Sequence, residues 1–173
     1  MWKRNAVVGV LRTRVSIFRE LKWLEYRLAE IKDVNKLSEM RWDFKCEEGA
    51  LDLNKKEDFV KDCSVFLKQA FIKNWYCWMA VDSGTIVSHI FIEKVEKIPE
   101  PNALSNNWGY LTNTYTIPKY RNRGIGTKLL SKASEWSKKQ GLELLVVWPS
   151  EKAISFYKRA GFQEKNEIME LLF

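Results

Sequence analysis

The sequence predicts a mixed α/β (α+β) fold, in which helices flank a mostly antiparallel central sheet. Three observations predict it. The turn residues Asp82-Ser83-Gly84 join two β-prone segments, which is typical of an antiparallel hairpin. Apolar residues recur at helical spacing over 55–73 and over 124–140, on either side of this hairpin. A continuous apolar run over 142–148 follows the second helix, as expected of a buried strand after a parallel crossover.

Periodicity, caps and breakers define the elements in order. We expect a strand over 26–31, a helix capped by Asp33 and ended by Gly49, the helix over 55–73 capped by Asn54, hairpin strands over 75–81 and 85–93, a strand over 108–117, the helix over 124–140, the strand over 142–148, a short helix from Ser150 to Ala160 and a strand over 168–173. The apolar stripe of the helix over 55–73 is Phe59, Cys63, Phe66, Leu67, Ala70 and Phe71. Alternation over 85–93 puts Ile86, Ser88, Ile90 and Ile92 on one face of the sheet, and Val87, His89 and Phe91 on the other.

Length and composition indicate one domain. The chain has 173 residues, of which 46% are hydrophobic and 29% charged. The net charge of +7 is uneven: residues 1–22 hold six basic residues and one acidic residue, a net +5, which leaves +2 for the other 151 residues. We therefore expect a basic extension over 1–22, as an arm or an added helix, before a domain over 23–173. A targeting peptide or a start codon assigned too early is the alternative for this extension.

Composition also bears on compartment, metals and partners. The three cysteines lack CxxC spacing, which favours buried free thiols in the reducing cytoplasm. With one histidine and no cysteine cluster, we expect no metal. No stretch reaches the roughly 18–20 apolar residues of a membrane span, so no membrane association is expected. The domain lacks a basic stripe with interleaved aromatic residues, so nucleic acid is not an expected partner.

A basic, glycine-containing loop between the strand over 108–117 and the next helix predicts a phosphate site. A helix N-terminus presents unpaired backbone N–H groups and the positive end of the helix dipole, and both bind phosphate oxygens. Gly124 and Gly126 let the backbone approach a ligand closely. A dinucleotide fingerprint is excluded because Leu129 stands where its third glycine belongs. A Walker A loop is excluded because a single residue separates the two glycines.

Two motifs resemble the GNAT acetyltransferase superfamily. The loop Arg121-Asn122-Arg123-Gly124-Ile125-Gly126 is similar to the family's Gln/Arg-x-x-Gly-x-Gly/Ala signature and has the same strand–loop–helix setting. The later segment Ala153-Ile154-Ser155-Phe156-Tyr157-Lys158-Arg159-Ala160-Gly161-Phe162 resembles the family's Ala-x-x-x-Tyr-x-x-x-Gly-Phe segment. The motifs follow each other in the family's order, and the resemblance covers roughly residues 26–173.

The resemblance implies a GNAT-type fold and an N-acetyltransferase that uses acetyl-CoA as co-substrate. Backbone groups of Tyr115 and Ile117, with Thr116 between them, would hold the pantetheine where the strands 110–117 and 142–148 splay apart. The pyrophosphate would bind the loop and the first helical turn, which comprise Arg121, Asn122, Arg123, Gly124, Ile125, Gly126 and Thr127. Tyr157 matches the residue that protonates the departing thiolate in many members. Ser150 stands where many members carry an Asn that bonds the pantetheine, so its hydroxyl either bonds the pantetheine or caps the short helix.

The expected acceptor is a primary amine that attacks the thioester directly, without a covalent enzyme intermediate. Asp43, Glu47 and Glu48 fall where the family builds its acceptor pocket, and Asn113 is a further candidate for acceptor binding. If the three carboxylates line this pocket, they favour a small cationic acceptor such as a polyamine or an aminoglycoside; otherwise they form a solvated acidic face. The general base stays open between a water relay and another residue. His89 is one candidate, and its alternative is a polar residue on a sheet face.

The sequence alone leaves other functions open. A non-catalytic acetyl-CoA-binding or sensory module would share the same site. A protein-directed N-acetyltransferase competes with a small-molecule enzyme. A nucleic-acid-binding protein that uses the basic extension is a third alternative. A homodimer is possible by analogy with the family.

Overall fold

A computed structural model of the chain describes residues 24–49, 51–101, 107–165, 169 and 171. The predicted extension over 1–22 and most of the predicted strand over 168–173 lie outside the described residues. The order of strands and helices predicted as far as residue 160 is confirmed. The mixed α/β architecture with a mostly antiparallel sheet is confirmed as well.

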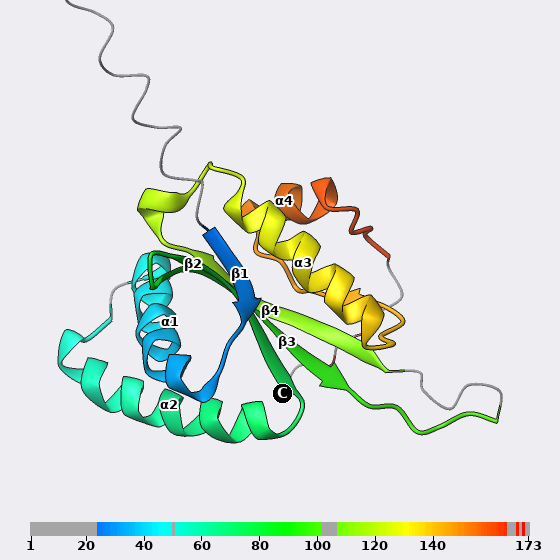
Figure 1. Cartoon of the computed structure of the whole chain (residues 1–173), viewed down its shortest axis with the longest axis horizontal. Helices are drawn as coiled ribbons and strands as arrows, with labels where there is room; N and C mark the ends of the chain where they lie inside the picture. Colours follow the sequence, from blue (N-terminus) through cyan, green and yellow to red (C-terminus); the bar gives the residue numbers. More distant parts are fainter. Residues whose placement is uncertain (1–23, 50, 102–106, 166–168, 170, 172–173) are drawn as a thin grey trace, which may run out of the picture.

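Within the described residues, five strands form one sheet in the order β1-β2-β3-β4-β5 (Figure 1). They are β1 (Leu24–Leu28), β2 (Trp75–Asp82), β3 (Thr85–Val95), β4 (Trp108–Thr116) and β5 (Leu145–Val146). The first four strands pair antiparallel, whereas β4 and β5 pair parallel. In the hairpin between β2 and β3, Ser83 and Gly84 have φ angles of 49° and 81°. Two positive φ angles in succession are what a type I′ hairpin turn requires, so the predicted turn is confirmed.

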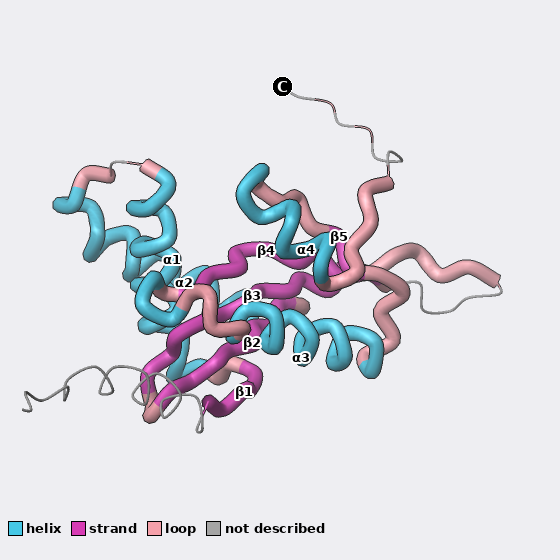
Figure 2. The backbone as a smooth tube through the Cα atoms, turned by 90° about the horizontal axis from the view of Figure 1, so that it is seen from above, coloured by secondary structure: helices cyan, strands magenta, loops and turns pink. Residues whose placement is uncertain are grey.

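Four helices cover this sheet. They are α1 (Val34–Glu48), α2 (Lys56–Ile72), α3 (Ile125–Lys139) and α4 (Ile154–Arg159). Seen from above, α1 and α2 lie on one face of the strands and α3 on the other, and α4 lies beside β4 and β5 (Figure 2). None of the helices in the described ranges is long and apolar enough to cross a bilayer.

Apolar side chains fill the space on both faces of the sheet. On one face, α1 and α2 contribute Val34, Leu37, Met40 and Leu67 to a cluster with Met79 and Phe91. On the other face, α3 contributes Leu129, Leu130 and Ala133 to a cluster with Ile90, Ile92 and Leu111. A fully buried aliphatic side chain contributes about 1.5–3 kcal/mol relative to an exposed one. The two clusters therefore hold β3 and β4 firmly between the helical layers, and the predicted stripe of α3 is confirmed.

A β-bulge makes part of the predicted facing of β3 wrong. The register places Val81 opposite Ile86 and Ala80 opposite Ser88, so Val87 is an extra residue in β3. Because an extra residue shifts the alternation, Ile86 packs in the α1 and α2 cluster and Val87 packs with Ile125. On α2, Phe66 of the predicted buried stripe is 55% exposed.

The last strand of the sheet is shorter than predicted. The apolar run over 142–148 contains only two strand residues, and Leu144 and Trp148 are each 51% exposed. Within the described residues, β5 is the last strand of the sheet and has a paired strand on one side only. Continuous apolar runs are typical of strands that are covered on both faces, so the run overstated the burial of this segment.

Two helix caps also differ from the prediction. Neither Asp33 nor Asn54 makes a side-chain cap bond to its helix; Asp52 instead accepts from the Asn54 amide. The Asp33 carboxylate accepts two hydrogen bonds from Arg27 of β1, at 2.7 and 2.9 Å, and one from the Glu30 amide at 2.8 Å. These bonds lower the pKa of Asp33 below its usual value, with the Arg27 hydrogen bonds as the largest cause. Asp33 therefore ties β1 to the start of α1.

We expect Asp33→Asn to lower the free energy of unfolding by about 2 kcal/mol at pH 7, because a buried charged hydrogen-bond pair is lost. The pKa of Asp33 is lower in the folded than in the unfolded chain. Its contribution is therefore full above the unfolded value of about 3.9, and is lost as pH falls through the folded value. Urea unfolding of the variant and of the parent protein from pH 7 down to pH 3 measures this difference. Glu25→Gln is the control, because Glu25 is exposed and lies 3.8 Å from the same guanidinium; an equal loss in both variants would contradict the assignment.

Candidate active site

The candidate site starts at the point along β4 where its pairing with β5 ends. β4 and β5 pair only at Gly109 with Leu145 and at Tyr110 with Val146. A Cβ on Gly109 would lie 2.5 Å from Cδ2 of Leu145, so glycine allows the two strands to approach here. Beyond Tyr110, no described strand pairs with this edge of β4. The remaining backbone groups on this edge are available to an extended ligand, as the predicted splay requires.

A second β-bulge lies on β4 beside this open edge. The register passes from His89 opposite Tyr115 to Phe91 opposite Thr112, so Asn113 and Thr114 together face Ile90. Asn113 has a φ of 48°, a left-handed conformation that asparagine tolerates better than most residues. Bulges change the direction of side chains and are frequent next to active sites. Here Thr114 contacts Tyr157 of α4, and Asn113 contacts Arg41 of α1, from the helical layer on the other face.

The hydrogen bonds between β3 and β4 show which backbone groups of β4 face β3. The Ile117 amide donates to Val87, and the Tyr115 carbonyl accepts from the Ser88 hydroxyl, so both groups face β3. Successive residues of a strand direct their backbone groups to opposite edges. Thr114 and Thr116 therefore face the open edge, where the Thr116 carbonyl accepts from the Arg121 Nε at 2.7 Å. Thr116 is among the residues predicted to hold the pantetheine, and Thr114 is an additional backbone candidate on this edge.

The loop after β4 ends in a helix N-terminus with unused donors. Gly124 adopts a φ of 75° as the N-cap of α3, and the first amide that bonds back to it is that of Lys128, at 3.0 Å. The amides of Ile125, Gly126 and Thr127 donate to no backbone group of the described chain. A Cβ on Gly126 would lie 3.6 Å from the Phe156 ring and 3.7 Å from the Thr116 Oγ1. These amides therefore point out beside the open edge, where they can bind an anion.

The two arginines of the loop differ in their surroundings. Arg121 donates to the Glu47 carboxylate at 2.6 Å and lies over the Tyr115 ring at 5.5 Å. Arg123 lies over the Tyr120 ring at 5.5 Å. Glu47 also accepts from the Tyr115 hydroxyl at 2.8 Å. Glu47 therefore links the end of α1 to β4 and to the loop, and it offsets part of the Arg121 charge.

Tyr157 is buried at the bulge, 5% exposed, and its hydroxyl donates to the Thr114 Oγ1 at 3.0 Å. Its ring packs against Phe156 and Phe162 of the second motif. Burial raises the pKa of the Tyr157 phenol, while the bond to Thr114 opposes this change. The phenol is therefore protonated near neutral pH. A neutral hydroxyl beside the open edge of β4 is suited to donating a proton.

Of the three carboxylates predicted to bind the acceptor, Glu47 is the one with contacts to residues of this site, namely Tyr115 and Arg121. Asp43 pairs with Lys56 at 3.5 Å, and Glu48 pairs with Lys45. Asn113 does reach the bulge, where its Oδ1 accepts from Arg41 at 3.0 Å. Sequence reasoning missed both Arg41 and Thr114, since no local pattern marks a bulge or the helix residue opposite it.

His89 lies beside the bulge and is fully buried. Its ring contacts Phe91 and Tyr115, and neither ring nitrogen makes a hydrogen bond of ordinary geometry within the described chain. Burial lowers the pKa of His89 to about 3; the nearby Asn113 amide opposes this change, and the Arg41 charge adds to it. The imidazole is therefore neutral and a weak base. This favours the interpretation of His89 as a core residue.

Ser150 is exposed and makes no side-chain cap bond, so the capping alternative is wrong and the pantetheine alternative stays a prediction.

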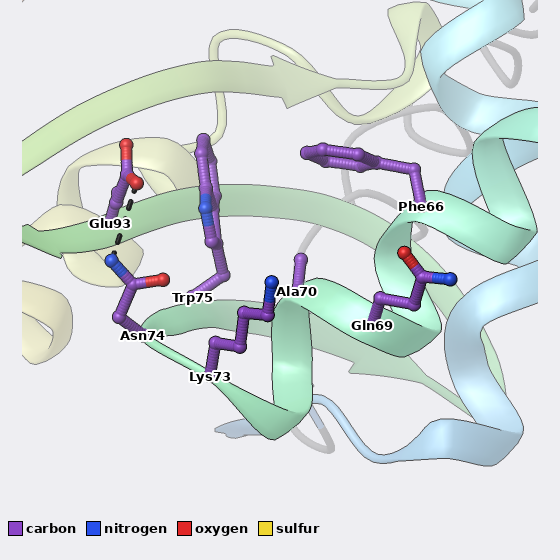
Figure 3. A pocket seen from close by; sticks show the side chains of 7 residues that line it. All are labelled: Phe66, Gln69, Ala70, Lys73, Asn74, Trp75 and Glu93. Atoms are coloured by element: carbon purple, nitrogen blue, oxygen red, sulfur yellow. Dashed lines mark hydrogen bonds between the residues drawn. The ribbon is translucent and has the colours of Figure 1, made fainter.

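The described residues contain no group of three or more His, Cys, Asp or Glu that could hold a metal ion. A cavity of about 260 Å³ lies elsewhere, between the end of α2 and the first residues of β2 (Figure 3). Phe66, Lys73 and Trp75 are among its lining residues, and none of the predicted site residues is.

Known proteins agree with this architecture. The model of the acetyltransferase (GNAT) family matches residues 36–162, and the chain belongs to this family. An uncharacterized N-acetyltransferase of Methanocaldococcus jannaschii is 46% identical over 57 residues, which are 31% of this chain and 25% of that protein. Thialysine N-epsilon-acetyltransferase of Mus musculus is 38% identical over 61 residues, 34% of this chain and 36% of that protein. The matched segments thus span about a quarter to a third of these relatives.

The fold has solved counterparts as well. The crystal structure of a predicted acetyltransferase with acetyl-CoA, from Clostridium acetobutylicum, superimposes with a TM-score of 0.70. The superposition covers 87% of this chain and 96% of that one, at 24% sequence identity. At this identity the likeness shows the fold alone, and it agrees with the mixed sheet and the flanking helices described above.

We expect Tyr157→Phe to lower kcat by about 100-fold and to leave acetyl-CoA affinity nearly unchanged, because the ring stays while the proton donor is lost. Steady-state rates at several pH values, together with calorimetric titration of acetyl-CoA, measure both quantities. Tyr76→Phe is the matched control, since Tyr76 packs on Trp136 of α3. An unchanged kcat for Tyr157→Phe across this pH range would remove the proton-donor role.

Proposed function

We propose that the chain is an N-acetyltransferase that transfers the acetyl group of acetyl-CoA to the primary amine of a small molecule. The observation that carries the proposal is the convergence of three features at one place. These are the open edge of β4, the unused amides at the start of α3 and the buried Tyr157 hydroxyl. The first suits an extended amide-containing arm, the second a pyrophosphate and the third a departing thiolate.

The reaction follows from these placements. The amine nitrogen attacks the carbonyl carbon of the thioester, and the new C–N bond forms before the C–S bond breaks. An alkylamine has a pKa of roughly 10 and is protonated near neutral pH, so it loses one proton before its nitrogen attacks; the proposed base is a water relay that carries this proton to solvent. After the attack the nitrogen loses a second proton by the same relay, Tyr157 gives its proton to the departing sulfur, and the Tyr157 phenolate takes a proton back from solvent. Holding both substrates in line supplies a large share of the rate.

The acceptor approaches from the α1 side in this proposal. Asn113 turns toward α1 and Thr114 contacts α4, so the bulge separates the two substrates across one strand. The mouse relative is named for thialysine, a small amine, which supports a small-molecule acceptor. A polyamine or an aminoglycoside stays a prediction, although Asp43, Glu47 and Glu48 each have a cationic partner in this structure. A cytoplasmic location and a homodimer also stay predictions.

The direct test is free-thiol release from acetyl-CoA with a panel of polyamines, aminoglycosides, amino acids and short peptides. Amine-dependent release supports the proposal and names the acceptor class; release with peptides alone favours a protein-directed enzyme. The melting temperature is measured with and without acetyl-CoA as a second readout. A raised melting temperature without release from any amine favours the binding module. No release and no change in melting temperature would contradict the whole assignment.

A further inference from the structure

We propose that Arg41 binds an anionic group, a carboxylate or a phosphate, on the amine acceptor. The proposal rests on the acetyltransferase function above and adds the chemical class of the acceptor. It starts from the position of Arg41 on α1. The Arg41 guanidinium donates to the Asn113 Oδ1 at 3.0 Å and lies over the Phe44 ring at 5.6 Å. These two contacts hold a half-buried cation against the bulge of β4.

The Arg41 guanidinium has unused hydrogen-bonding capacity. A guanidinium carries five N–H donors in a planar fork, and the side chain of Arg41 makes one hydrogen bond to the described residues. That single acceptor is a neutral amide, which leaves the positive charge without a counter-charge. The planar fork matches carboxylates and phosphates, which accept two parallel hydrogen bonds from it.

The neighbouring cations differ from Arg41 because each has a carboxylate partner. Lys45 pairs with Glu48, Lys56 with Asp43 and Arg121 with Glu47. No carboxylate of the described residues lies within 4.0 Å of the Arg41 guanidinium nitrogens. Among the described residues, the positive charge that faces Asn113 therefore has no carboxylate partner. The acidic residues that the sequence suggested for a cationic acceptor are already neutralised.

The other polar groups of this cluster add no negative charge. His89 is fully buried and its pKa is lowered to about 3, so the ring is neutral near pH 7. Asn113 is an uncharged amide. Lys45 lies over the same Phe44 ring at 5.9 Å and pairs with Glu48. A half-buried cation that lacks a carboxylate partner is costly unless an anion joins it. An anionic group on the acceptor supplies that partner.

The place of Arg41 fits an acceptor that carries both an amine and an anion. Asn113, which bonds Arg41, and Thr114, which bonds Tyr157, are consecutive residues of the same bulge. An anion at Arg41 therefore leaves the other end of a small molecule beside the open edge of β4. The amine at that end can face the thioester. A polyamine, by contrast, would place a second positive charge next to Arg41.

The test compares amines that differ only in the anion. For the carboxylate, 5-aminopentanoate is compared with 5-aminopentanamide. For the phosphate, 3-aminopropyl phosphate is compared with 3-aminopropan-1-ol. In the parent protein, we expect kcat/KM to favour the anionic member of at least one pair by about 10- to 100-fold, chiefly through KM. The pair with the larger ratio of kcat/KM, anionic member over neutral member, shows whether the preferred anion is a carboxylate or a phosphate.

Variants then connect the preference to Arg41. Arg41→Gln should remove the preference and leave the rate with the neutral amines nearly unchanged; Arg41→Lys should restore part of it. Lys36→Gln is the matched control, because it removes one positive charge from the exposed face of α1. An equal loss with anionic and neutral amines in Arg41→Gln would mean that Arg41 only supports the bulge. That result, or a parent preference for neutral amines or diamines, overturns the proposal.

A binding readout separates this inference from the acetyltransferase assignment. The same amine pairs are titrated by calorimetry into the protein saturated with CoA, which reads the acceptor site without turnover. A preference for the anion that Arg41→Gln abolishes supports the inference even if no acetyl transfer occurs. Equal binding of the paired amines, or no binding of either anionic amine in parent and variant alike, contradicts it. Release of thiol with neutral amines alone leaves the enzyme assignment standing and the Arg41 assignment refuted.

Discussion

The separation of β5 from β4 after two residue pairs is the constraint on which the rest of the site depends. Gly109 brings the strands together, and from Leu111 onward β4 has a hydrogen-bonding edge that no described strand occupies. An unpaired edge is ordinarily a liability, since it invites pairing with other chains. Here β4 contributes Tyr115 to the core cluster on one face of the sheet and Leu111 to the cluster on the other, so packing on both faces holds the strand while this edge stays unpaired within the described residues.

The groups around this edge come from separate parts of the chain, and each is fixed by its own local rule. The left-handed Gly124 starts α3 so that its first amides lie beside Thr116. The bulge at Asn113 and Thr114 interrupts the pairing with β3. As a result, Asn113 contacts Arg41 of α1 and Thr114 contacts Tyr157 of α4. Asn113 contacts a guanidinium and Thr114 a phenol, and in the proposed function the first contact marks the acceptor side and the second the thioester side.

Sequence patterns predicted the parts that obey local rules. The hairpin turn at Ser83-Gly84, the stripe of α3 and the start of α3 at the glycine loop depend on residues close in the chain, and the structure confirms them. The predicted facing of Ile86 and Val87 and the predicted length of the last strand were wrong, because each depends on pairing between distant strands. A bulge adds one residue to one strand and leaves no mark in composition or period. Arg41 was missed for the same reason, since only the bulge brings Asn113 to it.

The most direct test of this account is a titration of the isotope-labelled protein with acetyl-CoA, followed through the backbone amide resonances. The account predicts the largest chemical-shift changes at Ile125, Gly126 and Thr127 and at Thr114 and Thr116, with small changes over 66–75 around the other cavity. Large changes over 66–75 together with unchanged resonances at the start of α3 would contradict the claim that the open edge of β4 and the α3 amides form the acetyl-CoA site.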